Sequence, residues 1–160
     1  MLNETFSTQL KTLVINMDNY YDWSALKTTA PFTGVEYPDH NHPSAVDVQK
    51  ILNDISTANA DIIFVEGIFA FYFAELREKF DLKIYVDLQS DERLYRRMTR
   101  AEAYEPHEKI AHRYLDTVRY RHDEFVEPTR WYADIILNGT FGKCKGVPAV
   151  VAYIKANMAL

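Results

Sequence analysis

The sequence predicts an α/β fold in which helices cover both faces of a parallel β-sheet. Four short runs of almost uninterrupted apolar residues occur along the chain, at residues 12–18, 61–66, 82–87 and 133–137. Strands buried on both faces have this composition, whereas half-exposed strands alternate apolar and polar residues. Segments of helical character separate the runs, as the crossovers between parallel strands require. No repeat, low-complexity tract or long linker divides the chain, so we expect one domain over residues 1–160.

A short helix and a long loop flank the first predicted strand. A large apolar residue recurs at every fourth position of residues 2–10, which is typical of a helix. Residues 19–44 contain aromatic residues, prolines and a glycine and are expected to form a loop. Ser44 is expected to cap a helix that ends near Ser56, because a serine hydroxyl can accept a hydrogen bond from a free N–H of the first turn.

Four further helices are expected in the rest of the chain. Residues 68–80 are mostly apolar and would connect the second strand to the third. Two helices follow the third strand, from about Asp91 to Ala103 and from about Pro106 to Val126. The last helix runs from Val147 to Met158. Together these helices would cover the predicted sheet on both sides.

The composition excludes several classes of protein. The 160 residues carry a formal net charge of −5, which argues against non-specific binding of nucleic acid. No apolar run approaches the roughly 20 residues that a membrane-spanning helix needs. The single cysteine, Cys144, cannot form an intramolecular disulfide or a cysteine-based zinc site. This fits a reducing compartment, and we expect a cytoplasmic protein.

Polar residues and glycines follow each predicted strand. Asp18, Glu66 with Gly67, Asp87 and Asn138 all stand at carboxyl ends, where parallel sheets bind their ligands. The alternative is that polar residues simply end strands in any water-soluble protein. The functional interpretation is stronger for Asp18 and Glu66, because both follow fully apolar strands that should be neighbours in the sheet.

Several segments, in the same order along the chain, resemble the uridine kinase-like (phosphoribulokinase/uridine kinase) family of P-loop kinases. Residues 16–21, NMDNYY, resemble the family segment in which an aspartate precedes two aromatic residues. Residues 41–47, NHPSAVD, resemble its DHPDAFD segment, and residues 62–72, IIFVEGIFAFY, resemble its FEGILAFY strand and turn. Residues 82–100 and 114–136 resemble two further stretches, and the second includes EFVEPTRWYADII. The resemblance covers most of the chain and implies a P-loop NTPase-like sheet.

The resemblance implies ATP and Mg²⁺ as cofactors and transfer of the γ-phosphate to a hydroxyl of a nucleoside or similar small molecule. It makes Asp18 the candidate base that accepts the hydroxyl proton. Arg97 and Arg100 would lie on the lid and stabilise charge on the moving phosphoryl group. Glu66, with Asp18, would hold Mg²⁺ through water, and Gly67 would let the backbone approach the phosphates.

The resemblance also implies a substrate pocket. Tyr20 and Tyr21 would wall it, Asp47 would hydrogen-bond sugar hydroxyls, and His42 would complete it. Structural alternatives remain open, because the tyrosines could be core aromatics and Asp47 could stabilise the first turn of a helix. Three basic residues are interpreted as helix-surface residues: Arg93, Arg96 and His122.

The chain departs from the family pattern in its phosphate-binding loop. The motif G-x-x-x-x-G-K-[ST] does not occur in the 160 residues. Only Gly142 precedes a lysine, and Cys144 follows where a magnesium-binding Ser or Thr would stand. In this fold the strand before that loop is central, so its absence would leave two strands without their shared partner and the ATP site incomplete. We therefore expect an N-terminally incomplete domain that is inactive as given.

Two further departures concern the acceptor and the lid. Residues 57–60 leave no room for the hairpin that reaches over the base in uridine kinases, so uridine is only one candidate acceptor. Residues 101–107 lack the RGRD sequence of the family lid. Two alternative functions stay open: a non-catalytic pseudo-kinase or regulatory binding protein, and one half of a split kinase completed by another chain. A homo-oligomer is also considered, whereas nucleic acid and membranes are not expected partners.

Overall fold

The computed structural model describes residues 2–22, 24, 26–101, 103–140 and 146–158, so the segment containing Gly142 and Cys144 lies outside the described residues. All four predicted strands are present. β1 (Thr12–Asn16) pairs in parallel with β4 (Ile62–Glu66). β5 (Ile84–Asp87) pairs in parallel with β6 (Ile135–Asn138). The predicted α/β class is therefore confirmed, but within the described residues the strands form two separate parallel pairs.

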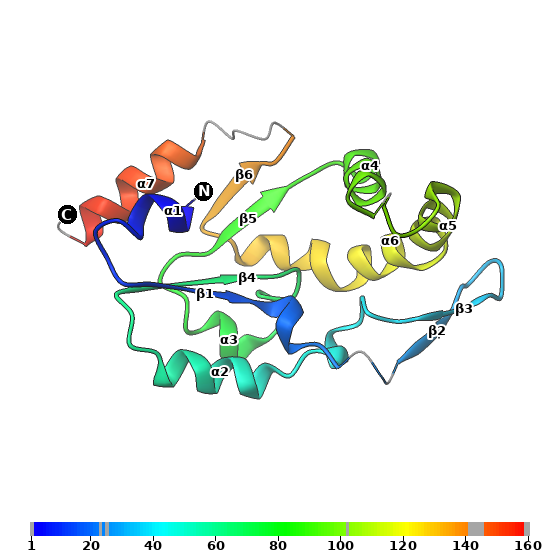
Figure 1. Ribbon diagram of the computed structural model, residues 1–160, viewed down its shortest axis with the longest axis horizontal. Helices are drawn as coiled ribbons and strands as arrows, with labels where there is room; N and C mark the ends of the chain where they lie inside the picture. The colour runs from blue at the N-terminus through cyan, green and yellow to red at the C-terminus, as the bar shows by residue number, and fades with distance from the viewer. Residues whose placement is uncertain (1, 23, 25, 102, 141–145, 159–160) are drawn as a thin grey trace.

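Helices lie on both sides of these strand pairs (Figure 1). α2 (Val48–Thr57) and α3 (Ala74–Arg77) lie on one side of β1 and β4. α1 (Leu2–Phe6) and α7 (Gly146–Asn157) lie together on the other side, near β6. None of the described helices has both the length and the apolar character needed to cross a bilayer.

The core forms where β1, β4 and α2 meet the segment after β4. Its largest fully buried side chains include Met17, Ile51, Phe69 and Leu76, each at most 1% exposed. Each comes from a different segment, so burial of apolar area ties the sheet to the helices on one face. This packing holds the carboxyl ends of β1 and β4 in place.

The helix predicted to start at Ser44 starts later. Asp47 is its N-cap, and the Asp47 carboxylate accepts a hydrogen bond from the Lys50 N–H at 3.0 Å. Ser44 belongs instead to a 3-10 turn, Pro43–Ala45, capped by His42. The proline fixes the backbone of that turn, so the α-helix begins only after it.

The helix predicted over residues 68–80 is wrong for its first half. Only α3 is helical, whereas the segment before it forms turns, with bonds from the Ala70 N–H to the Gly67 carbonyl and from Tyr72 to Phe69. Phe69, Ala70 and Phe71 are all buried, which one face of an α-helix cannot achieve with consecutive residues. The Arg77 guanidinium also donates to the Phe71 carbonyl at 2.6 Å.

The loop predicted over residues 19–44 contains an antiparallel hairpin. β2 (Lys27–Thr29) pairs with β3 (Glu36–Pro38). Gly34 adopts φ of +71° in the connection, a conformation that favours glycine. The strands are only three residues long each, too short for an alternating pattern to stand out in the sequence.

The two helices predicted after β5 are confirmed. The first is α4 (Ser90–Ala101). The second is a continuous helical segment that changes type along its length, here called the long helix: α5 (His107–Arg113), π-helical Tyr114–Val118, α6 (Arg119–Arg121), π-helical His122–Val126 and 3-10 Glu127–Tyr132. In a regular α-helix, residues four apart drift around the axis by about 40° per step. The wider π turns counter this drift, so Tyr114, Val118, His122 and Val126 share one face.

Candidate active site

Two carboxylates lie at the ends of neighbouring strands. Asn16 and Glu66 are partners in the register of β1 and β4, which confirms that these strands are adjacent. The chain after Asn16 turns at once into a 3-10 helix, Met17–Tyr20, because the Asn16 side chain accepts a hydrogen bond from the Asp18 N–H at 2.9 Å. Asp18 and Glu66 are both exposed, and neither carboxylate has a hydrogen-bond or ion-pair partner among the described residues. Both are therefore available to a ligand.

Gly67 lies in close contact with Met17 at the carboxyl ends of β4 and β1. A Cβ atom on Gly67 would lie 2.6 Å from the Met17 Cβ, closer than real side chains approach. The buried Met17 side chain therefore requires a glycine at this position. The predicted role of Gly67 toward phosphates stays a prediction, but this contact sets the turn that carries Asp18 against the end of β4.

The two tyrosines after Asp18 differ in their surroundings. The Tyr20 hydroxyl donates to Asp54 of α2 at 2.7 Å, and this bond together with burial raises the pKa of Tyr20 to about 12. Tyr21 bridges to Val46, and burial followed by the negative charge of Asp18 raises the pKa of the Tyr21 hydroxyl above its ordinary range. Only Tyr21 is thus tied electrostatically to the Asp18 carboxylate, and Tyr20 braces the 3-10 turn against α2.

His42 and Asp47 serve local structure in the described chain. The His42 Nδ1 lies 2.7 Å from the Ser44 hydroxyl, and the ring packs edge-on against Phe125 of the long helix at 4.8 Å. Asp47 is the N-cap of α2, so the structural role that the sequence offered for this residue, stabilising the first turn of a helix, is confirmed. Asp47 is exposed, so one carboxylate oxygen remains open to solvent, and its predicted contact with sugar hydroxyls stays a prediction.

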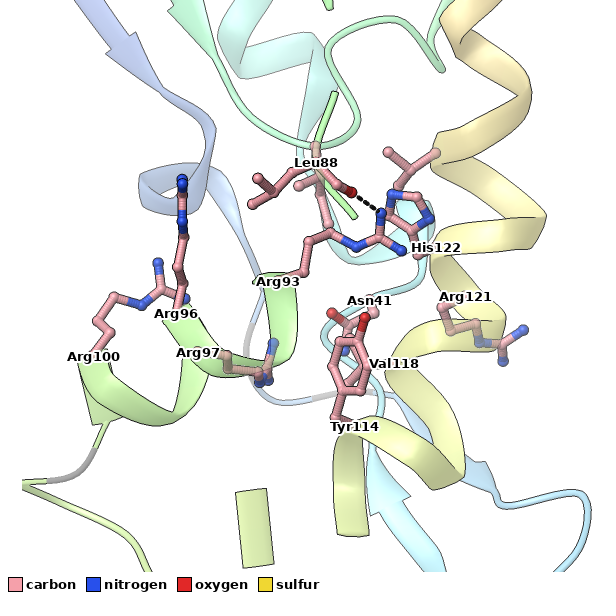
Figure 2. A pocket seen from close by; sticks show the side chains of 12 residues that line it. Asn41, Leu88, Arg93, Arg96, Arg97, Arg100, Tyr114, Val118, Arg121 and His122 are labelled. Atoms are coloured by element: carbon pink, nitrogen blue, oxygen red, sulfur yellow. Dashed lines mark hydrogen bonds between the residues drawn. The ribbon is translucent and has the colours of Figure 1, made fainter. Parts of the chain in front are cut away.

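A cavity of about 460 Å³ lies between α4 and the long helix (Figure 2). We call it the arginine cavity, because five of its lining residues are arginines. Arg93, Arg96, Arg97 and Arg100 come from α4, and Arg121 comes from the facing helix. No acidic residue lines it among the described residues. Such a concentration of fixed positive charge suits an anion with several oxygen atoms, such as a phosphate group.

The arginines of α4 fall into two pairs. Arg93 donates to the Leu88 carbonyl at 2.6 Å, and Arg96 donates to the Gly139 carbonyl at 2.7 Å, so both tie α4 to the strand ends. Arg97 and Arg100 have no hydrogen-bond or ion-pair partner among the described residues. Burial, then the charges of Arg113 and Arg100, lower the pKa of Arg97. An unpaired guanidinium in such surroundings gains most from an incoming anion.

Sequence interpretation did not single out Arg121 and assigned three other residues of this cavity to a helix surface. Arg93 and Arg96 were assigned to a solvated helix face, and His122 to a helix surface, but the structure places all three in the cavity lining. His122 is half-buried, and burial followed by the charge of Arg93 lowers the pKa of its imidazole despite a contact with Asp123. A lining residue recurs at every fourth position from Tyr114 through Val118 to His122. This spacing could have indicated that the three residues share one face of a helix.

The arginine cavity adjoins the strand ends. Ile68 and Leu88 both line it, and they follow Glu66–Gly67 and Asp87 directly in the chain. Asn41, which precedes His42, lines it as well. The cavity therefore reaches the ends of β4 and β5, and β4 ends at the exposed Glu66.

The residues at this edge fit a magnesium ion, although no group of three or more His, Cys, Asp or Glu side chains is assembled within the described part of the chain. Magnesium is commonly held by one or two carboxylates, with waters and substrate phosphates as its other ligands. Asp18 and Glu66 supply two carboxylates that have no partner within the described part of the chain, at the ends of the neighbouring strands β1 and β4. The donor set thus matches what Mg²⁺ takes from a protein when phosphates supply the rest.

These features define a class: an α/β protein that presents carboxylates and a cationic cavity at the ends of parallel strands, as P-loop kinases do. Comparison with protein families agrees. Residues 10–141 match the phosphoribulokinase/uridine kinase family. The chain is 33% identical over 159 residues to a uridine kinase of Chlamydia pneumoniae, covering 80% of this chain and 69% of the relative. It is 48% identical over 79 residues to a uridine kinase of Staphylococcus aureus strain JH9, covering 48% of this chain and 38% of that relative.

The chain belongs to the phosphoribulokinase/uridine kinase family. The family resemblance that the motifs indicated is thereby confirmed, together with the kinase-like α/β fold. Part of each relative's length, 31% and 62% respectively, lies outside the matched region, since the matches cover 69% and 38% of the two relatives.

Proposed function

We propose that the protein is part of an ATP- and Mg²⁺-dependent phosphotransferase that transfers the γ-phosphate to a hydroxyl of a nucleoside or a similar small molecule. One observation carries this proposal: a cavity lined by five arginines reaches the residues that follow β4 and β5, and β4 itself ends at the exposed carboxylate of Glu66. A phosphoryl-transfer site needs positive charge over the moving group and a carboxylate near the attacking hydroxyl. The two uridine kinase relatives are consistent with a nucleoside acceptor.

Each residue has a specific role in this proposal. Asp18 accepts the proton of the acceptor hydroxyl, since its exposed carboxylate projects from the turn at the end of β1. Arg97 and Arg100 neutralise the phosphate oxygens, because they are the cavity arginines that have no hydrogen-bond or ion-pair partner within the described part of the chain. Glu66 and Asp18 would hold Mg²⁺, which supplies charge neutralisation to the phosphates when bound.

The proposed acceptor pocket lies at the two 3-10 turns that precede α2. Tyr21, Asp47 and His42 belong to or flank these turns, and the Tyr20 hydroxyl ties the first turn to Asp54 of α2. Asp47 and His42 keep polar atoms near this surface, which suits a hydroxyl-rich ligand such as a sugar. This surface does not select one acceptor among hydroxyl-rich molecules, so ribosyl or pantothenate-like alcohols are tested beside uridine.

A phosphate-cradling loop must complete the site. The sequence has no G-x-x-x-x-G-K-[ST] motif, and backbone N–H groups of such a loop hold the nucleotide phosphates in P-loop proteins. We propose that the 160 residues bind phosphate groups but do not turn over ATP by themselves. The alternative, a regulatory protein that binds an anion without catalysis, is favoured by the same missing motif.

One experiment separates these functions. The chain is compared with a version extended at its N-terminus by a designed apolar strand and a G-x-x-x-x-G-K-[ST] loop. Acceptor-dependent conversion of ATP to ADP is followed with uridine, cytidine and pantothenate, and the product is identified by phosphorus NMR. The kinase proposal predicts turnover only in the extended version. A folded extended version that binds ATP and Mg²⁺ but phosphorylates none of the acceptors would favour the regulatory alternative.

A further inference from the structure

We propose that the hairpin of β2 and β3 holds one wall of the arginine cavity in position, and that Asp116 is the positioning residue through which it acts. Asp116 belongs to the π-helical turn Tyr114–Val118, and both end residues of this turn line the cavity. This role rests on the proposed function, because the wall would face a bound phosphate group. The contacts between the hairpin and the long helix can nevertheless be measured whether or not an anion binds.

The hairpin presents one of its faces to the long helix (Figure 1). Thr28 of β2 and Tyr37 of β3 are partners in the strand register, so their side chains lie on the same face. Both are half-buried, whereas their neighbours along each strand are exposed. The Tyr37 hydroxyl donates to Asp116 at 2.8 Å, and the Thr28 hydroxyl accepts from the Arg121 Nη2 at 3.3 Å. The half-buried face is therefore the one that contacts the long helix.

Asp116 binds two parts of the hairpin with one oxygen atom. Its Oδ2 accepts from the Tyr37 hydroxyl and also, at 3.1 Å, from the hydroxyl of Thr33 in the connection between the strands. A carboxylate oxygen has two lone pairs, so both bonds can form at once. The bond to Asp116 is the main reason that the pKa of Tyr37 is raised. A single side chain thus ties the connection and the second strand to one turn of the long helix.

A second tie lies at the end of the hairpin. Asp39 directly follows β3 and is 3% exposed; its Oδ2 accepts from the Arg121 Nε at 3.0 Å. Its Oδ1 accepts from the N–H of Asn41 at 3.3 Å, and Asn41 lines the cavity. Figure 2 shows the Arg121 side chain on the side of the long helix away from α4, where it also donates to Glu124 at 2.8 Å. Arg121 therefore fastens the hairpin, although its residue borders the cavity.

The cavity wall lies on the other side of the long helix from these ties. Tyr114, Val118 and His122 form it, and they face α4 in Figure 2. The Tyr114 hydroxyl donates to the Ser90 carbonyl, at the start of α4, at 3.0 Å. The long helix is thus held to α4 on one side and to the hairpin on the other.

The helix type gives the hairpin something to hold. A π turn is rare in proteins, and it is found mostly where function requires it. If Tyr114–Val118 relaxed to a regular α-helix, residues four apart would again drift by about 40° per step. Val118 and His122 would then rotate out of line with Tyr114 and change the width of the cavity. The ties to the hairpin oppose this rotation.

Two variants of one residue separate positioning from charge. Asp116→Ala removes both hydroxyl bonds and should weaken tripolyphosphate binding roughly tenfold, the lower end of the loss that supporting hydrogen bonds cause at metal sites. Asp116→Asn keeps an oxygen that can accept from both hydroxyls and should bind at least as tightly as the unmodified chain. Both variants remove a negative charge, which by itself would strengthen anion binding. Calorimetric titration measures the affinities.

Hydrogen exchange is the second readout. Asp116→Ala should speed amide exchange in the hairpin and in residues 114–122 by about tenfold, because the local opening of both becomes easier, whereas Asp116→Asn should not. Glu36→Gln is the matched control, since it breaks an exposed ion pair with Lys27 within the hairpin and leaves the ties to the long helix intact. It should change neither readout.

The outcomes decide the proposal. Tripolyphosphate binding that is undiminished in Asp116→Ala, or equally weakened in Asp116→Ala and Asp116→Asn, would overturn it. If circular dichroism shows that Asp116→Ala is unfolded, the double variant Thr33→Val/Tyr37→Phe removes the two donors instead and should weaken binding to the same extent. If the unmodified chain does not bind tripolyphosphate, the proposed phosphate site is wrong, and the exchange rates alone show whether the hairpin holds the turn.

Discussion

The arginine cavity lies at the carboxyl ends of β4 and β5, whereas an apolar groove of about 540 Å³ lies along β4 and the start of β5. The two regions differ in the chemical groups that they offer to a ligand. The arginine cavity is lined mainly by α4 and the long helix, with Asn41 and the residues after β4 and β5 completing it, and it offers charged side chains. The groove offers an apolar lining and two unpaired backbone edges. Side chains can recognise a small anion by themselves, whereas backbone edges require another strand. The comparison predicts that anion binding in the arginine cavity depends on side chains and is independent of the backbone edges in the groove.

The largest expected effect concerns chemistry at the strand ends. In the extended version with turnover, Asp18→Asn should reduce the phosphoryl-transfer rate by roughly 10²-fold or more, the usual scale for a positioned base. Glu36→Gln, which removes an exposed carboxylate on β3, is the matched control. The rate is measured at saturating ATP and acceptor. Unchanged turnover in Asp18→Asn would remove this residue from the mechanism.

A second prediction concerns the wall of the arginine cavity. Asp39 is 3% exposed, and its carboxylate accepts a hydrogen bond from the Arg121 Nε at 3.0 Å. Asp39→Ala should lower the free energy of unfolding by about 2–3 kcal/mol, because it leaves a partly buried guanidinium with fewer partners. Glu124→Ala, which removes the exposed partner of the same arginine, should cost at most about 1 kcal/mol. Denaturant unfolding gives both values.

The same pair of variants sharpens the comparison between the two regions. Asp39 joins the segment after β3 to the long helix, so its loss should also weaken anion binding in the arginine cavity. Amide-exchange protection of β4, which lines the groove, should be unchanged in the folded variant. Equal losses at both places would show that the two regions are not independent.

A third prediction concerns the turn that positions Asp18. Gly67→Ala should lower the free energy of unfolding by about 1–3 kcal/mol, because the new Cβ would lie 2.6 Å from the Met17 Cβ. Gly34→Ala should cost about 1 kcal/mol at most, since a Cβ there meets nothing within 4 Å and only its φ of +71° is unfavourable. Thermal or denaturant unfolding compares the two. A smaller cost at Gly67 than at Gly34 would contradict the proposed close contact.

The smallest expected effect is a pH dependence of anion binding. Burial and Arg93 keep the pKa of His122 below its ordinary value, so the imidazole is neutral near pH 7. An anion in the cavity favours the imidazolium, so binding takes up a proton and affinity should rise as the pH falls below about 6.5. The increase should be at most about tenfold, the equivalent of one unit of pKa.

Sulfate is the suitable probe for this pH dependence, because its own charge is constant in the range. His122→Gln should abolish the increase and leave affinity at pH 8 nearly unchanged. The same depressed pKa predicts that stability falls as the pH drops through about 6.5, since the unfolded chain then binds a proton that the folded chain does not. An affinity for sulfate that is flat with pH in the unmodified protein would contradict the placement of His122.

Much of the fold could be predicted from the sequence because strands buried on both faces are continuous apolar runs. The prediction failed where burial of consecutive residues or tertiary contacts, rather than apolar composition, determine the local structure. The segment after Gly67 forms turns because three consecutive residues are buried, which apolar composition alone does not reveal. The short hairpin after residue 26 depends on tertiary contacts such as that from Arg121 to Thr28.

The candidate site was predicted in part for a similar reason. Asp18 and Glu66 were predicted from their place after apolar strands, and the pairing of β1 with β4 confirms that they end neighbouring strands. Arg93, Arg96 and His122 were missed because an arginine or histidine on an amphipathic helix has the same pattern whether its face meets solvent or another helix. Only the packing of α4 against the long helix distinguishes the two.

The central claim is that the arginine cavity binds phosphate groups in this chain as it stands, and calorimetric titration with tripolyphosphate tests it most directly. Replacing both Arg97 and Arg100 by alanine should weaken binding by roughly 10²- to 10⁴-fold, because each charged hydrogen-bond donor removed is worth about 1.5–3 kcal/mol. Arg119→Ala, at an exposed position of the long helix outside the cavity lining, should leave binding unchanged. Equal affinity in all three proteins, or no binding to the unmodified chain, would contradict the account.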